Sequence, residues 1–197
     1  MDLVRTQSSL RVLILTIFAV LGQLGSAQAD WKWVYEGMAE DGQIVLGFRA
    51  GPSYMTQNAG TSTSGPLLNW HAMYAINKWF RTGMMLEWES HSFDQRGRGS
   101  LDTVSLLPAM LEFRPGHFGP LIPYVSTGIG VNINDSNVSD SFAWRMAGGL
   151  DYALTNWFPN APPGLMLNTE AAWKRNRIDR VDYSTLSLIF GIRFAFQ

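Results

Sequence analysis

Apolar and polar residues alternate along most of this chain, and the alternation is clearest near its C-terminus. In the segment 184–197, the even positions from Leu186 to Phe196 are all apolar, while the odd positions are small or polar apart from Ile189. Successive side chains of a strand point to opposite faces, so one face suits hydrocarbon and the other a crowded polar interior. The segment also supplies the roughly nine to eleven residues that cross a bilayer as a tilted strand.

The same pattern predicts eight strands, separated by clusters of Gly, Pro, Asn, Asp and Ser. We expect them near 43–55, 66–77, 80–93, 101–114, 121–133, 141–154, 164–176 and 182–196. The fourth segment is the least regular, because Leu107 and Leu111 face away from Glu112 while Leu106 and Met110 share its side. The predicted fold is all-β: an eight-stranded, antiparallel, up-and-down transmembrane β-barrel.

Charged residues fall on the polar faces of these strands, and we call them the luminal charge network. The bases are Arg49, Arg81, Arg145, Lys174 and Arg193, and the acids are Glu87, Glu89, Glu112, Asp151 and Glu170. A soluble β-sandwich exposes its charges to water and needs no balance, whereas a small barrel in lipid encloses them and needs partners. The even balance therefore favours the barrel over the sandwich.

Glycines gather on the same side as these charges: Gly47, Gly51, Gly83, Gly128, Gly130, Gly149 and Gly191. The interior of an eight-stranded barrel is just wide enough for side chains to fill it. Long Arg and Glu side chains then need neighbours of almost no volume, so we expect these glycines to make room for them.

The segment 1–29 is predicted to be a secretory signal peptide, and residues 30–197 one outer-membrane β-barrel domain. Arg5 and Arg11 precede an apolar run that ends at Leu21, and Ala27-Gln28-Ala29 offers a small-x-small cleavage pattern. An uncleaved N-terminal anchor is the alternative. Export of an aromatic-rich chain without a transmembrane helix after residue 29 predicts a location in the cell outer membrane.

The composition of the chain excludes some kinds of binding site. The chain has no cysteine, which excludes disulfides and thiolate metal sites. Without Asp2, Arg5 and Arg11, the 16 acids and 15 bases become 15 and 13, so the net charge is about −2. This charge does not indicate nucleic-acid binding, which calls for a basic face.

The sequence predicts no catalytic residue, metal site or cofactor. His91 and Ser92 are adjacent, so on one strand they point to opposite faces and form no dyad. Glu87 and Glu89 share a face, and we expect them to pair with luminal bases such as Arg81. The alternative is an outer-membrane lipid-modifying enzyme with His71 or His91 as its base.

The links between strands alternate in character. Those near 56–65, 94–100, 134–140 and 177–181 are polar and are expected to be extracellular, whereas the others carry aromatic residues or prolines and are expected to be periplasmic. Near the extracellular rim, five arginines could contact lipopolysaccharide phosphates: Arg96, Arg98, Arg175, Arg177 and Arg180. Solvated loop charges are the alternative. The expected periplasmic aromatic girdle comprises Trp79, Phe118, Trp157, Phe158 and Phe196.

The stretch 107–132 contains Pro123-Tyr-Val-x-x-Gly128-x-Gly130-x-Asn132 after a short turn, and Gly149-Leu-Asp-Tyr152 follows it. These motifs resemble the OmpW-like and OmpA-like small outer-membrane barrels. The resemblance implies contact with outer-membrane lipids and lipopolysaccharide, and recognition of the C-terminal strand by the barrel-assembly machinery. It also implies a structural role, or narrow passage for small solutes including hydrophobic ones. The alternatives are a lipid A deacylase-like enzyme and a surface recognition barrel that acts through its loops.

Overall fold

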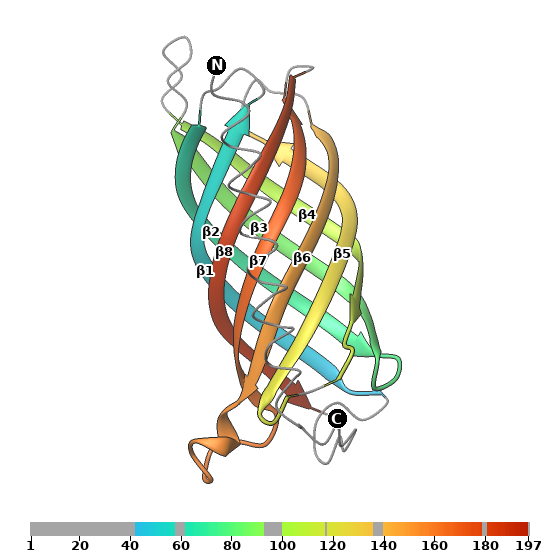
Figure 1. Cartoon of the computed structure of the whole chain (residues 1–197). Helices are drawn as coiled ribbons and strands as arrows, with labels where there is room; N and C mark the ends of the chain where they lie inside the picture. The colour runs from blue at the N-terminus through green and yellow to red at the C-terminus, as the bar shows by residue number, and fades with distance from the viewer. Residues whose placement is uncertain are drawn as a thin grey trace, which may run out of the picture. The chain divides into compact units, whose positions relative to one another are not determined.

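The computed structural model describes residues 42–57, 62–92, 100–116, 118–135, 140–178 and 181–196, which form a closed barrel (Figure 1). Its strands are β1 (Ile44–Gln57), β2 (Ser62–Ala75), β3 (Phe80–Ser92), β4 (Ser100–Phe113), β5 (Leu121–Asn134), β6 (Ser141–Ala153), β7 (Leu165–Ile178) and β8 (Val181–Phe196). A short 3-10 helix, η2 (Leu154–Asn156), follows β6. The predicted signal peptide, 1–29, lies outside the described residues.

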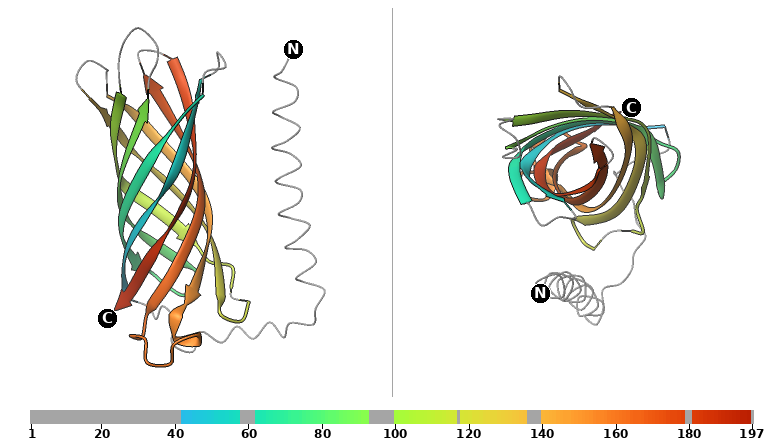
Figure 2. Two further views of the ribbon diagram at one scale, coloured as in Figure 1. Left: turned by 90° about the vertical axis from the view of Figure 1, so that its left-hand side faces the viewer. Right: turned by 90° about the horizontal axis from the view of Figure 1, so that it is seen from above.

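Every strand pairs antiparallel with the next, and β8 closes the ring on β1, with Ile44 opposite Phe196. Seen from above, the described strands surround a single interior (Figure 2). The predicted eight-stranded up-and-down barrel is therefore confirmed. The end that carries Ile44 and Phe196 is called the terminal end here, and the opposite end is called the tip end.

Strand β2 begins at Ser62, four residues before the expected start at 66. The extra residues extend the hairpin, because Ser62 pairs with Thr56 and Ser64 with Tyr54 of β1. The sequence concealed this extension because it is rich in Ser, Thr and Gly. Beyond the hydrocarbon layer both faces of a strand can be polar, so the alternation that marks a membrane strand disappears there.

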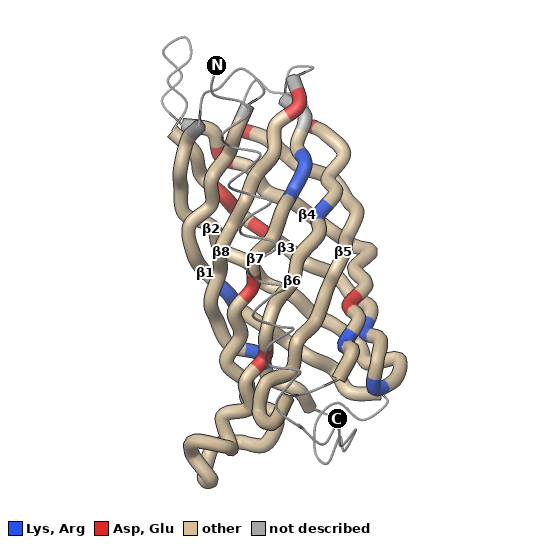
Figure 3. The backbone as a smooth tube through the Cα atoms, in the orientation of Figure 1, with Lys and Arg blue, Asp and Glu red and all other residues tan. Residues whose placement is uncertain are grey.

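The two faces of the barrel invert the usual arrangement of a soluble protein. Large apolar side chains point outward and are exposed, with Phe142 at 65% and Phe190 at 56%. Charged side chains point inward, and Arg49 and Glu89 are both 0% exposed. Charges of both signs are distributed over the strands (Figure 3). Such an apolar exterior suits hydrocarbon, and the barrel is therefore a transmembrane one. Within the described residues, no helix has the length and apolar character needed to span a bilayer.

Strand β4 contains a bulge at Pro108. Leu106 pairs with Val131 and Ala109 with Ile129, so three steps along β4 oppose two along β5. Proline lacks an N–H group and cannot donate to the ladder, which makes bulges one of the few positions in a sheet that accept it. One extra residue in a strand exchanges the faces of all residues beyond it.

This bulge corrects the assignment of faces in β4. We expected Leu106 on the side of Glu112 and Leu107 on the opposite side. Instead Leu107 is fully buried in the lumen and Leu106 is 41% exposed outside. Met110 and Glu112 lie beyond the bulge and are both buried, as expected. The simple alternation therefore fails for the first half of the strand only.

The inward glycines serve two purposes rather than one. At Gly149, an added Cβ would lie 2.4 Å from the Tyr124 ring, and at Gly47 it would lie 2.2 Å from the His71 ring. These glycines, with Gly128, leave room for luminal side chains, but the nearest ones are Tyr124, His71 and Met110 rather than the expected Arg and Glu. At Gly51, Gly83, Gly130 and Gly191, the Cβ would instead meet a backbone oxygen of the neighbouring strand. Those four permit close approach of backbones, and the expected reason applies as well at Gly191, where the Cβ would lie 2.8 Å from Arg49 Cγ.

Aromatic residues collect at the terminal end. Trp79 stacks on Phe113 with ring centroids 6.4 Å apart, and Trp157 lies 4.8 Å from the Tyr152 ring. Trp157 and Phe158, in the link after β6, are 63% and 59% exposed. Exposed aromatic rings are typical of residues at a membrane–water interface.

The luminal charge network as candidate functional site

The structure places all ten predicted members of the luminal charge network inside the barrel, each no more than 2% exposed. They project from six strands, β1, β3, β4, β6, β7 and β8. The other two strands contribute neutral polar groups, including Asn69 from β2 and Tyr124 from β5, which are also buried. Strands far apart in the sequence therefore meet in one interior.

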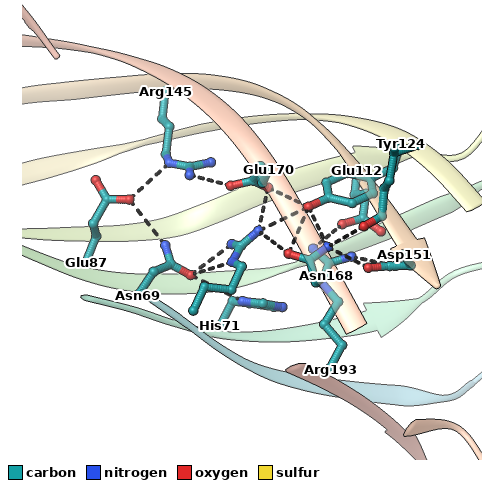
Figure 4. Close-up of polar contacts among 12 residues, drawn as sticks. Asn69, His71, Glu87, Glu112, Tyr124, Arg145, Asp151, Asn168, Glu170 and Arg193 are labelled. Atoms are coloured by element: carbon teal, nitrogen blue, oxygen red, sulfur yellow. Dashed lines mark hydrogen bonds and ion pairs between the residues drawn. The ribbon is translucent and has the colours of Figure 1, made fainter. Parts of the chain in front are cut away.

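Glu170 lies at the middle of the network, between two guanidinium groups (Figure 4). Its carboxylate oxygens lie 2.5 Å from Arg49 Nη1 and 2.5 Å from Arg145 Nη2. The Tyr124 hydroxyl donates a third hydrogen bond to Glu170 at 2.8 Å. Arg145 continues to Glu87, whose Oε2 lies 3.2 Å from Arg145 Nε. The Glu170 carboxylate thus shares its charge between Arg49 and Arg145.

Toward the tip end, Lys174 bridges two acids. Its Nζ atom lies 2.8 Å from Glu87 and 2.7 Å from Glu89, and it donates to the Ser105 hydroxyl at 2.9 Å. Glu87 is therefore common to the Arg145 contact and the Lys174 contact. The predicted pairing of Glu87 and Glu89 with a luminal base involves Lys174 and Arg145 rather than the suggested Arg81.

Toward the terminal end, two acids and three bases form a compact group. Arg193 lies 2.8 Å from Glu112 and 3.0 Å from Asp151. Arg114 contacts the same two acids, with Nε 2.8 Å from Glu112. Arg81 approaches Glu112 at 3.4 Å. Each acid here is shared by at least two guanidinium groups.

Arg114 is a member of the network that the sequence analysis missed. It is the last residue of the expected segment 101–114 and also begins the link that follows, and the structure shows that it is only 1% exposed. Among the described luminal residues, six bases therefore face five acids, so the expected even balance is wrong by one base. The sequence does contain evidence that Arg114 points into the lumen, because it lies two residues after Glu112 and thus on the same side of the strand.

Neutral groups join the charged pairs into a continuous network. Asn69 accepts a hydrogen bond from Arg49 Nη2 at 2.8 Å and donates to Glu87 at 3.2 Å. Asn168 donates to Asp151 at 2.6 Å and to the Tyr124 hydroxyl at 2.9 Å. Buried charges and polar groups are stable only when hydrogen bonds of this kind satisfy them.

His91 and Ser53 form the contact that most resembles a catalytic pair. Ser53 Oγ lies 3.1 Å from His91 Nε2, and Glu89 Oε2 lies 3.5 Å from the same nitrogen. A nucleophile–base–acid relay needs the serine and the acid on different ring nitrogens, and here Nδ1 has no hydrogen-bond partner. All three residues are 0% exposed. The group therefore lacks both relay geometry and an accessible nucleophile.

His71, the other histidine that the structure describes, has a structural contact. His71 Nδ1 lies 3.3 Å from Asn69 Oδ1 in the lumen. Within the part of the chain that the structure describes, no cluster of three His, Asp or Glu side chains is arranged to hold a metal ion. Ser92 is exposed while His91 is buried, so these neighbours do face opposite sides.

Of the five arginines expected to contact lipopolysaccharide, the structure describes the side chain of Arg175. It is exposed on the outer face of β7, 2.8 Å from Asp182 of β8. Arg96, Arg98 and Arg180 lie outside the described residues, as does the side chain of Arg177.

No protein-family model matches the chain, and no curated protein matches it in sequence. Its fold is similar to that of solved outer-membrane proteins. Neisserial surface protein A is 16% identical over 79% of this chain and 100% of its own, with a TM-score of 0.62. The outer membrane protein OprG from Pseudomonas aeruginosa is 11% identical over 82% and 99%, with a TM-score of 0.52. The expected resemblance to small outer-membrane barrels is confirmed at the level of the fold.

Proposed function

We propose that the protein is a structural barrel of the bacterial outer membrane whose lumen is closed by the luminal charge network, Arg114 included. One observation carries the proposal: the charged side chains across the interior are at most 2% exposed and are connected by ion pairs. A wide, water-filled pore would leave luminal charges in contact with water.

The position of the network supports closure along the barrel axis. It extends from Arg114, at the terminal end of β4, to Lys174 and Glu89 nearer the tip end. A solute that crosses must separate several of these contacts, and removing one partner of a buried ion pair costs about 3–5 kcal/mol. Passage is therefore restricted to narrow, transient openings suited to small solutes.

The outer membrane is the location that the surface chemistry and the fold favour. Exposed apolar side chains surround the strands, and the solved proteins of similar fold are outer-membrane proteins. The polypeptide reaches β1 at the terminal end, so an exported chain has this end in the periplasm. The tip end then faces the cell exterior, where its polar links contact the surroundings.

Conductance of the refolded barrel in planar lipid bilayers tests the proposal. We expect the wild-type protein to give no stable unit steps, and Arg145→Ala to give measurable steps because it removes a bulky cation from the middle of the lumen. Asp182→Asn is the control, since Asp182 lies on the outside and is 42% exposed. Large, stable steps from the wild-type barrel would overturn the closed lumen. Release of acyl chains from lipid A by the silent barrel would favour the enzyme instead.

A further inference from the structure

A hollow on the outer wall, near the tip end, has features of a ligand site that the luminal network does not explain. It has a volume of about 300 Å³ and is lined by Phe142, Trp144, Arg175, Asn176 and Asp182. These residues come from three consecutive strands, β6, β7 and β8. The volume is at the lower end of the range for small-ligand pockets, about 300–1,000 Å³. It therefore suits one sugar ring with its nearest substituents rather than a whole lipid.

The charged wall of the hollow is formed by Arg175 and Asp182. Their side chains are 56% and 42% exposed and meet at 2.8 Å through Arg175 Nη2. An exposed pair of this kind contributes little to stability, so it needs another reason to face outward. Outward charges are unfavourable in the hydrocarbon layer but tolerated at the membrane interface. Arg175 therefore lies outside the hydrocarbon layer, where lipid headgroups can reach it.

The aromatic part of the hollow lies beside Arg175, since Trp144 of β6 pairs directly with Arg175 of β7, and contacts hold the Trp144 ring in place. The Trp144 indole N–H donates to the Thr127 hydroxyl at 3.3 Å, and its ring meets Trp173 edge-on at 5.4 Å. Phe142, also on β6, is 65% exposed. A flat aromatic face that is already oriented can receive the apolar C–H face of a sugar ring at little entropic cost.

We propose that this hollow binds one phosphorylated sugar of the lipid A headgroup of lipopolysaccharide, an inference that rests on the proposed outer-membrane location. The Arg175 guanidinium would bind the phosphate, since guanidinium groups form paired hydrogen bonds with phosphate. The Asp182 carboxylate would accept hydrogen bonds from sugar hydroxyl or amide groups. Trp144 and Phe142 would cover the ring and the first carbons of its acyl chains.

This ligand uses both charges of the pair, which is the reason to prefer it to a simple anionic lipid. A headgroup that offers phosphate alone would gain from Arg175 but would meet repulsion from Asp182, 2.8 Å away. A sugar phosphate brings hydrogen-bond donors for the carboxylate as well. The tip end is also the end that the proposed orientation places in the outer leaflet.

Native mass spectrometry of the refolded barrel in detergent, with added diphosphoryl lipid A or phosphatidic acid, whose headgroup is phosphate alone, tests the inference. We expect lipid A to bind the wild type more tightly than phosphatidic acid, and Arg175→Gln to weaken lipid A binding at least tenfold. Lys78→Gln is the matched control, because Lys78 is an exposed cation 5.4 Å from the Trp79 ring in a link at the terminal end. It should leave lipid A binding unchanged.

Two further variants keep the test decisive. Arg175→Lys retains the charge without the planar fork, so it should bind lipid A with intermediate affinity even if the glutamine variant folds poorly. Asp182→Asn should weaken lipid A binding severalfold and strengthen phosphatidic acid binding, because it removes a charged acceptor for the sugar and the repulsion on a bare phosphate. Equal lipid A affinity in wild type, Arg175→Gln and Arg175→Lys would overturn the site. Equal affinity of the wild type for the two lipids would overturn the sugar assignment. Neither result depends on conductance, which tests the closed lumen separately.

Discussion

Replacing Glu170 by Gln should strongly destabilise the barrel, because it removes a charge that two buried cations share. Arg49 and Arg145 each lie 2.5 Å from this carboxylate. Arg145 keeps a second acid, Glu87, at 3.2 Å. Arg49 keeps neutral hydrogen-bond partners, chiefly the Asn69 side-chain oxygen at 2.8 Å. Gln has nearly the shape of Glu, so the effect is that of the charge and not of a cavity.

The magnitude follows from the burial of the group. Removing one partner of a buried ion pair costs about 3–5 kcal/mol, because the other charge remains without compensation. We expect a loss of this size in the free energy of unfolding, measured by urea denaturation of the barrel in phospholipid vesicles. Tryptophan fluorescence and the heat-dependent shift of the folded band in gels provide two independent readouts.

Asp182→Asn is the control for this experiment, since it makes the same chemical change in an exposed pair. Arg175 and Asp182 are 56% and 42% exposed, and pairs of that kind contribute about 0–1 kcal/mol. A similar, small effect of both variants would refute the reasoning, because it would mean that water reaches Glu170 and screens its charge. Replacing Arg49 and Glu170 together by Met should recover much of the lost stability.

Further predictions concern packing and the lipid-facing surface. Gly149→Ala should lower the free energy of unfolding by about 1–3 kcal/mol, since its Cβ would lie 2.4 Å from the Tyr124 ring. Gly148→Ala should be nearly neutral in the same urea titration, because its Cβ would lie 3.9 Å from the nearest atom. Leu188→Arg, outward and halfway along β8, should cost about 2–4 kcal/mol in vesicles, whereas Ile133→Arg, near the end of β5, should cost about 0–1 kcal/mol. Equal costs at these two positions would contradict the assigned membrane depth.

The fold was predictable because the membrane strands carry a two-residue period over most of their length. In β8, the outward residues from Leu186 to Phe194 are apolar and exposed, and the inward Thr185 and Arg193 are buried. Hydrocarbon on one side and a narrow lumen on the other leave little freedom at each position, so the pattern persists. Where the strands leave the hydrocarbon, as at Ser62, this constraint ends and the boundary was misplaced.

The sequence predicted which residues belong to the luminal charge network, but not which of them form ion pairs with one another. The alternation of faces along a strand identifies which side chains point inward, yet it does not say which strands meet across the lumen. Lys174 pairs with Glu87 and Glu89, residues about half the described chain away, because the barrel curvature brings β3 and β7 together. The contact between Ser53 and His91 was missed for the same reason. Arg114 was missed because it stands at the boundary between the expected segment 101–114 and the following link, one residue beyond the end of β4.

The long-range pairing inside the barrel also has a consequence for its biogenesis. Arg49 of β1 meets Glu170 of β7, and Glu87 and Glu89 of β3 meet Lys174 of β7, so these early side chains find those counter-ions only when the late strands arrive. A partly built sheet would present bare guanidinium groups to acyl chains. Insertion and closure should therefore occur in concert, with the nascent edge shielded until the final hairpin docks.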